Sequence, residues 1–158
     1  MNQTTSNASH AADTAAPAPA AIREIVIVDA SCERYGEFVR SAQDGEISVH
    51  FCVDGRSAIR LAKRFRADTW LVAADLPDMS GFDLVDMLAP HVEHANVDPL
   101  LAGSRISLDR PVRAGIFVVS DAYRIEEEQR ALAAGVTGYL VRPVGLDVIS
   151  AVADAYRR

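Results

Sequence analysis

Cysteine is scarce in this sequence, and its scarcity argues against a disulfide-stabilised fold. The 158 residues include only two cysteines, Cys32 and Cys52, and the two do not form a CxxC pair. Small secreted scaffolds carry several paired cysteines, so two isolated ones favour a reducing compartment. Cys52 lies within an apolar run and is expected in the core, where a free thiol behaves as a small apolar group. We therefore expect a cytoplasmic protein.

Long apolar runs are absent as well, and positive charge is in the minority. No stretch approaches the roughly 20 apolar residues that cross a bilayer. The N-terminus lacks the basic start and continuous apolar core of a signal peptide. Sixteen Lys and Arg residues oppose 22 Asp and Glu residues, which gives a formal net charge of −6. Because non-specific nucleic-acid binding relies on clustered positive charge, we expect neither nucleic acid nor a membrane as a partner.

The common catalytic and nucleotide-binding signatures are missing too. The sequence contains no GxGxxG, no P-loop, no GxSxG and no HExxH. His91 and His94 stand three residues apart, but no third ligand follows at good metal-binding spacing. We expect no enzymatic activity, no metal site and no bound cofactor.

Composition divides the chain into a tail and one domain. The first 21 residues are mostly Ala, Pro, Thr, Ser and Asn without an apolar period, and such a segment buries too little surface to offset its ordering entropy. Apolar residues make up 49% of the whole chain, enough for a substantial core. We predict a disordered tail over residues 1–21 and a domain over residues 22–158, with order beginning at Arg23.

Strand and helix signals alternate five times after the tail. The expected strands are continuous apolar runs, and Ser31 is expected to cap the first helix. The strand predictions cover residues 25–28, 47–53, 70–73, 115–120 and 138–141, and the helix predictions cover 32–43, 56–66, 82–89, 125–134 and 146–156. Regular alternation with fully apolar strands predicts an α/β fold, a five-stranded doubly wound parallel sheet with helices on both faces.

One segment, about residues 92–114, does not fit this repeat. It adds about twenty residues between the third helix and the fourth strand, where the connection needs only a few. Three interpretations of this segment remain open: a mobile insert, a packed accessory element or a partner-binding loop.

The chemistry is expected at one edge of the sheet. In open parallel sheets, ligands bind beyond the carboxyl ends of the strands, where the strand order reverses. That rule gathers Asp29, the stretch from Ala73 to Asp75, Ser120 and Arg142 into one pocket, although they lie far apart in the sequence.

Two segments resemble the response-regulator receiver domain of two-component signalling. LPDMSGFDL, from Leu76 to Leu84, is similar to the loop and helix that follow that family's phosphorylated Asp. ALAAGVTGYLVRPV, from Ala131 to Val144, is similar to its fourth helix and fifth strand. The resemblance covers residues 23–158 except the insert. It implies a flavodoxin-like (βα)5 receiver fold with an insert between helix three and strand four.

The resemblance also implies a chemistry that this pocket has lost. An active receiver carries an acceptor Asp four residues before the loop Pro, an acidic pair that binds Mg2+, and a Lys before a Pro that usually follows a cis peptide bond. This sequence has Ala73 at the acceptor position, Ala30 after Asp29 in the acidic pair, and Arg142 before Pro143. Ser120 matches the family's hydroxyl position. Arg142 could form a salt bridge across the pocket with Asp29 or Asp75.

Three functions follow from these residues. The first is a stand-alone pseudo-receiver, a phosphorylation-independent interaction module for a signalling protein or a histidine kinase. The second is a phosphorylatable receiver that uses Asp75 as acceptor and requires Mg2+. The third is a flavodoxin-like domain that binds a small anion at Arg142 and Ser120.

The resemblance points to one surface for partners. Tyr139 matches the aromatic that active receivers swing inward as a switch. The fourth helix, fifth strand and fifth helix form a surface through which many receivers dimerise, so a homodimer is expected there. The sequence ends soon after the last predicted helix, and we expect no output domain to follow.

Overall fold

The computed structural model describes residues 23–94 and 115–157. The predicted tail over residues 1–21 and most of the predicted insert, residues 95–114, lie outside the described residues. Of the insert, only residues 92–94 are described, and they belong to a helix.

Strands and helices alternate as the sequence predicts. All five strands are found within two residues of their predicted bounds. In chain order the elements are β1 Arg23–Val28, a 3-10 helix η1 Cys32–Tyr35, α1 Gly36–Gln43, β2 Ile47–Cys52, α2 Gly55–Ala62, β3 Thr69–Ala73, α3 Gly81–His94, β4 Gly115–Ser120, α4 Ile125–Ala133, β5 Gly138–Val141 and α5 Leu146–Arg157.

The strands form one parallel sheet in the order β2-β1-β3-β4-β5. The order reverses between β1 and β3, where Val28 pairs with Val72. On the other side of β3, Ala73 pairs with Val119. The carboxyl ends of β1, β3 and β4 therefore lie side by side, which is where a doubly wound sheet binds its ligands.

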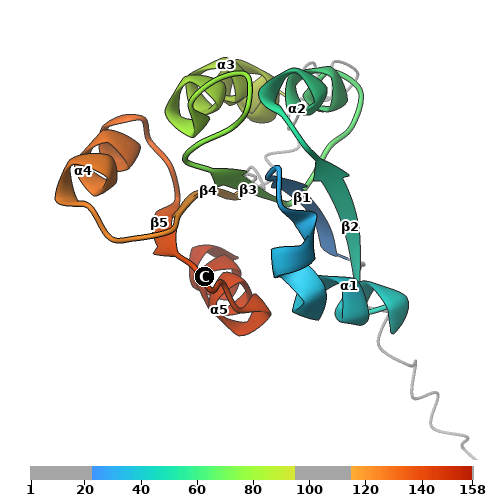
Figure 1. Ribbon diagram of the computed structural model, residues 1–158. Coiled ribbons are helices and arrows are strands. Elements are labelled where there is room, and N and C mark those ends of the chain that lie inside the picture. Colours follow the sequence, from blue (N-terminus) through green and yellow to red (C-terminus); the bar gives the residue numbers. More distant parts are fainter. Residues whose placement is uncertain (1–22, 95–114, 158) are drawn as a thin grey trace, which may run out of the picture.

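Two apolar cores fill the space between the sheet and its helices. Helices α2, α3 and α4 lie on one face of the sheet, and η1, α1 and α5 lie on the other (Figure 1). Fully buried Leu88 on α3 and Ile149 on α5 represent the two faces. The predicted doubly wound α/β fold is confirmed. No helix within the described ranges is long and apolar enough to span a bilayer.

Three helix ends differ clearly from the prediction. The second helix, predicted over residues 56–66, ends at Ala62. Ser31 does not cap a helix with its side chain; its backbone N–H instead donates to Asp29 Oδ1 at 2.9 Å, and η1 begins at the next residue. Helix α3 does not end before Pro90 but continues to His94. Val92 is buried on the same stripe as Leu88, so tertiary packing offsets the roughly 3 kcal/mol cost of a proline inside a helix.

Candidate functional site

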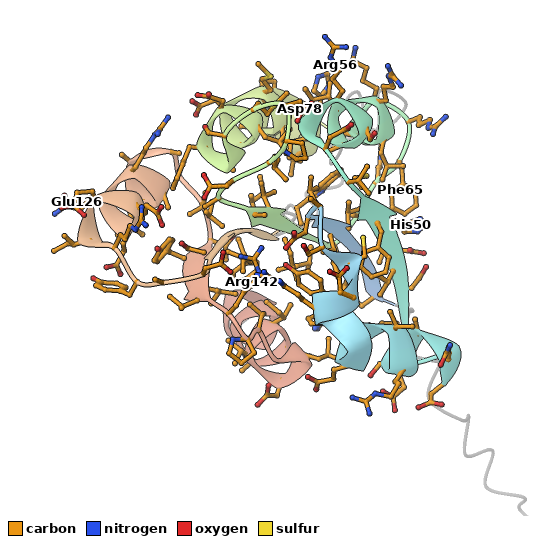
Figure 2. All side chains as sticks on the ribbon, viewed as in Figure 1. His50, Arg56, Phe65, Asp78, Glu126 and Arg142 are labelled. Carbon is orange, nitrogen blue, oxygen red and sulfur yellow. The ribbon has the colours of Figure 1, made fainter. Side chains whose placement is uncertain are left out.

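The predicted pocket residues gather at the carboxyl edge of the sheet, but only some of them interact. Asp29 follows β1, Ser120 ends β4, and Arg142 follows β5. Backbone bonds fix two of these positions: the Asp29 N–H donates to the Cys52 carbonyl at 2.9 Å, and the Arg142 N–H donates to the Ser120 carbonyl at 2.9 Å. Figure 2 shows the Arg142 side chain lying beside the sheet, on the side of α1 and α5.

An ion pair between Arg142 and Asp29 occupies the middle of the pocket. Arg142 Nη2 donates to Asp29 Oδ2, and the two side chains are only 14% and 6% exposed. The same Asp29 oxygen accepts a hydrogen bond from the Tyr35 hydroxyl at 2.8 Å. The salt bridge expected for Arg142 is therefore present, with Asp29 as the partner rather than Asp75.

Tyr35 is held neutral in this cluster. Burial raises the pKa of Tyr35 well above its usual value, and its hydrogen bond to the Asp29 carboxylate raises it further. A buried carboxylate needs such donors, because an unpaired charge away from water is costly. Asp29 receives three of them, from Tyr35, Arg142 and the Ser31 backbone.

Asp121 joins two arginines at the mouth of the pocket. Its Oδ1 accepts from Arg34 Nη1 at 2.6 Å and from Arg142 Nη1 at 2.9 Å. The Asp121 side chain is 71% exposed and that of Arg34 is 48% exposed. The hydrogen bond from Arg34 and the charge of Arg142 hold the pKa of Asp121 below its usual value.

A cavity of about 240 Å³ opens beside these arginines. It lies between the segment after β1 and the segment after β5, and it is lined by Arg34, Tyr35, Arg142, Pro143 and Val144. The Nε of Arg142 is buried, and no atom of the described residues accepts a hydrogen bond from it.

The acceptor position at the end of β3 is filled by a buried methyl group. Ala73 is 1% exposed, and its carbonyl lies so close to Gly81 that a Cβ on that glycine would overlap it. The Gly81 N–H donates to the Ala74 carbonyl at 2.7 Å. The glycine therefore allows α3 to begin directly against the end of β3.

Asp75 does not belong to the pocket's ion-pair network. It lies two residues beyond the last strand residue, Ala73, and is exposed. It forms an isolated antiparallel bridge with Ser80 across the loop. The sequence left open whether Asp75 ends the strand, and the structure places β3 earlier, so Asp75 is a loop carboxylate.

The other aspartate of this loop has a structural role. Asp78 accepts hydrogen bonds from the backbone N–H groups of Gly55 at 2.8 Å and Arg56 at 3.0 Å. These two donors belong to the first turn of α2, whose own cap is Asp54. Asp78 thus anchors the loop to the start of α2, where a negative charge is favourable.

The remaining predicted positions are found at the same edge. Ala30 is exposed directly after Asp29, and Ser120 is buried. The Arg142–Pro143 peptide bond is cis, as expected from the resemblance. Among the described residues, no three His, Cys, Asp or Glu side chains lie close enough together to hold a metal ion.

Tyr139 is half-buried and tied to the start of α4. Its hydroxyl donates to Glu127 Oε2 at 2.7 Å and lies 3.2 Å from the Ala122 carbonyl. Burial raises the pKa of Tyr139, a hydrogen bond with Ser120 opposes that rise, and the bond to Glu127 adds to it. The hydroxyl thus connects β5 with the segment between β4 and α4.

Three residues of this site, Arg34, Tyr35 and Asp121, were not predicted from the sequence. Asp121 directly follows the end of β4, so the rule about strand carboxyl ends could have included it. Arg34 and Tyr35 lie in η1, at the start of the helix predicted over residues 32–43, but that prediction assigned their side chains no role in the pocket.

Comparisons with known proteins identify the fold. No family model matches the sequence, and no curated protein matches it. A response regulator from Burkholderia pseudomallei, solved with a phosphorylated aspartic acid, calcium and citrate, aligns with 85% of this chain and 71% of its own at TM-score 0.63 and 19% identity.

Two further solved structures agree. A CheY-like receiver domain protein from Methanospirillum hungatei aligns over 86% of this chain and 97% of its own, at TM-score 0.63 and 18% identity. A two-component response regulator from Clostridium difficile has the same coverage and identity at TM-score 0.66. Fold does not fix function at such identities. The chain has the fold of response-regulator receiver domains, with an arginine–aspartate pair in its pocket and an alanine at the end of β3.

Proposed function

We propose that this protein is a pseudo-receiver, a cytoplasmic, non-enzymatic module that binds a signalling protein without being phosphorylated. The observation that carries the proposal is the buried ion pair between Arg142 and Asp29 beside Ala73. Alanine offers no nucleophile for a phosphoryl group. The neighbouring carboxylate, which would attract Mg2+ in an active receiver, is already neutralised by an arginine.

The pocket's charges support this proposal. Mg2+ prefers oxygen ligands in a near-octahedral shell, yet both oxygens of Asp29 already accept hydrogen bonds, from Ser31, Tyr35 and Arg142. A guanidinium is always charged and presents a planar fork, so it does not release the carboxylate as readily as a mobile Lys ammonium would. Metal binding would have to break this pair.

The surface of α4, β5 and α5 is the proposed partner site. Its side chains include Ile125, Leu132, Val141 and Val148, all of them large, apolar and exposed. Apolar groups exposed close together on a surface favour protein contacts. A second copy of this chain is an alternative occupant of this surface.

Phosphodonor labelling tests the proposal directly. The full chain is incubated with a small-molecule phosphodonor and Mg2+, and intact mass is measured by mass spectrometry. We expect no mass increase for the wild type or for an Asp75→Asn variant. A phosphate that is present in the wild type and lost in Asp75→Asn would contradict the proposal, because the exposed loop carboxylate would then be a working acceptor.

A further inference from the structure

The cavity beside Arg34 and Arg142 has the chemistry of an anion site. Two arginines, Arg34 and Arg142, are among its lining residues, together with Tyr35, Pro143 and Val144. Guanidinium groups match carboxylate and phosphate oxygens because their planar N–H donors form strong, directed hydrogen bonds. The structure already contains one such anion, since the Asp121 carboxylate bridges the two arginines.

Asp121 is held much less firmly than Asp29. Its side chain is 71% exposed, whereas that of Asp29 is 6% exposed. An exposed ion pair is screened by water and contributes little to stability, whereas breaking a buried pair leaves an uncompensated charge away from water. An anion from solution would therefore displace Asp121 and leave the Arg142–Asp29 pair intact.

The guanidinium groups also keep unused donors. Each arginine side chain has five N–H donors, and Asp121 accepts from only one nitrogen of each. Arg142 Nε also lacks an acceptor among the described residues, but it is buried and is not one of the donors that an anion from solution would meet.

The cavity's size limits the class of ligand. Its volume of about 240 Å³ is below the roughly 300–1,000 Å³ of pockets that enclose drug-sized ligands. It is about eight times the roughly 30 Å³ that one water occupies in the liquid. A single phosphate or a short carboxylate therefore fits in this space.

We propose that the cavity between Arg34 and Arg142 is a reversible binding site for a small oxyanion, phosphate or a short carboxylate, with Asp121 as its internal competitor. The site uses Arg34 of η1 and excludes Ala73 and Asp75, so it is distinct from the acceptor position. It goes beyond the proposed pseudo-receiver function, because a bound anion would make the pocket responsive to a metabolite without any covalent step.

Titration of the full chain with inorganic phosphate tests the site. Binding is followed by calorimetry or by NMR shifts at constant ionic strength, with acetate as the carboxylate probe and chloride as the salt control. We expect a Kd on the order of millimolar for phosphate or acetate. Arg34→Gln should weaken it about fivefold or more, because it removes a charge-assisted pair.

The variant that identifies the mechanism is Asp121→Asn. It removes the competing charge and should tighten binding about threefold to tenfold, in line with the strength of exposed ion pairs. Matched controls are Arg60→Gln, an exposed arginine of α2 without an ion partner in the described part of the chain, and Asp83→Asn, an exposed partner of Arg130. Neither control should change the Kd.

Three results would overturn the site. The first is that neither anion binds at concentrations up to about a hundredfold above the expected Kd. The second is that Asp121→Asn binds the anion more weakly than the wild type. The third is that Arg34→Gln and Arg60→Gln lose the same amount of affinity. None of them bears on the phosphodonor experiment, which measures a covalent product, so each proposal fails separately.

Discussion

At Asp29, a buried carboxylate depends on its neighbours for its charge. Arg142, Tyr35 and the Ser31 backbone supply all of its hydrogen bonds among the described residues. Removing one partner leaves a buried charge without a counter-charge, which is strongly destabilising. Replacing both charged side chains leaves no buried charge and only alters how the side chains pack. This asymmetry makes the pair accessible to a double-mutant cycle.

We expect Arg142→Met to lower the free energy of unfolding by about 2–4 kcal/mol, because Asp29 then stays buried without its cation. The double variant Asp29→Asn/Arg142→Met should recover about half of that loss, since no charge remains buried. Urea unfolding at pH 7 is measured for the wild type, for both single variants, Asp29→Asn and Arg142→Met, and for the double variant. If the two substitutions are simply additive, Asp29 and Arg142 do not act as a pair.

Tyr35 predicts an alkaline loss of stability. Its folded-state pKa is raised by burial and by Asp29, while an unfolded chain releases this proton near pH 10. Above about pH 10 the unfolded state therefore binds fewer protons than the folded state, and stability falls as pH rises. Urea unfolding between pH 9 and 11 should show a shallower decline for Tyr35→Phe than for the wild type. An unchanged slope would mean that Tyr35 does not titrate in this way.

The place of a single residue in the pocket could be predicted from the sequence where it depends only on the residue's position relative to the end of a strand. Ala73 and Arg142 were assigned to the pocket by the rule about strand ends and Ala30 by the resemblance to receivers, and each lies at the expected end of its strand. The role of Asp121 depends on the side chains of two arginines that lie 87 and 21 residues away in the sequence. No periodic pattern in the sequence predicts that these two arginines contact Asp121.

At the scale of elements, the loop between β3 and α3 makes two contacts that stabilise the fold. Asp78 holds the start of α2, and Gly81 lets α3 approach Ala73. Both contacts stabilise the fold whether or not phosphotransfer occurs. The similarity of residues 76–84 to receiver domains therefore indicates a shared fold and does not by itself indicate phosphotransfer.

Asp78→Ala should destabilise the protein by about 1–2 kcal/mol, because two backbone donors at the start of α2 lose their acceptor. Asp75→Ala, three residues earlier in the same loop and exposed, should change stability by less than about 0.5 kcal/mol. Thermal or urea unfolding compares the two variants. Equal effects would remove the structural distinction between these aspartates.

Gly81→Ala should cost about 2–4 kcal/mol, because the added methyl group overlaps the Ala73 carbonyl and forces β3 and α3 apart. Gly36→Ala is the matched control, since nothing lies within 4 Å of a Cβ at that helical position. It should stabilise the protein by about 0.4–1 kcal/mol. A mild effect of Gly81→Ala would show that the turn can relax.

Elements were predicted well where apolar runs are continuous and poorly where packing overrides local preference. The β5 prediction matches Gly138–Val141 at both ends. The preference of proline for helix ends predicted that helix three would end before Pro90. The observed helix α3 continues past Pro90, and Val92 in its last turn is buried. The first helix was predicted as one element over residues 32–43, but its start is the separate 3-10 helix η1, and the Ser31 side chain makes no cap hydrogen bond there.

At the scale of the whole molecule, the sheet separates two cores that should respond independently. Leu88→Ala and Ile149→Ala each remove a fully buried side chain, one from each face, and each should cost about 2–5 kcal/mol. Their effects should add within about 0.5 kcal/mol, because the residues share no partner. Chemical unfolding of both single variants and the double variant checks this sum. A coupling well above that margin would show that the two cores relax together.

The pairing of Asp29 with Arg142 also sets an order of events during synthesis. The two residues are 113 positions apart, and chains emerge from the ribosome N-terminal end first. Because synthesis adds about 5–20 residues per second, Arg142 is made several seconds or more after Asp29. During that interval the first strand and its aspartate can pair with β2, but the aspartate cannot be buried at low cost. The last β-α unit thus supplies the cation that completes the surroundings of Asp29.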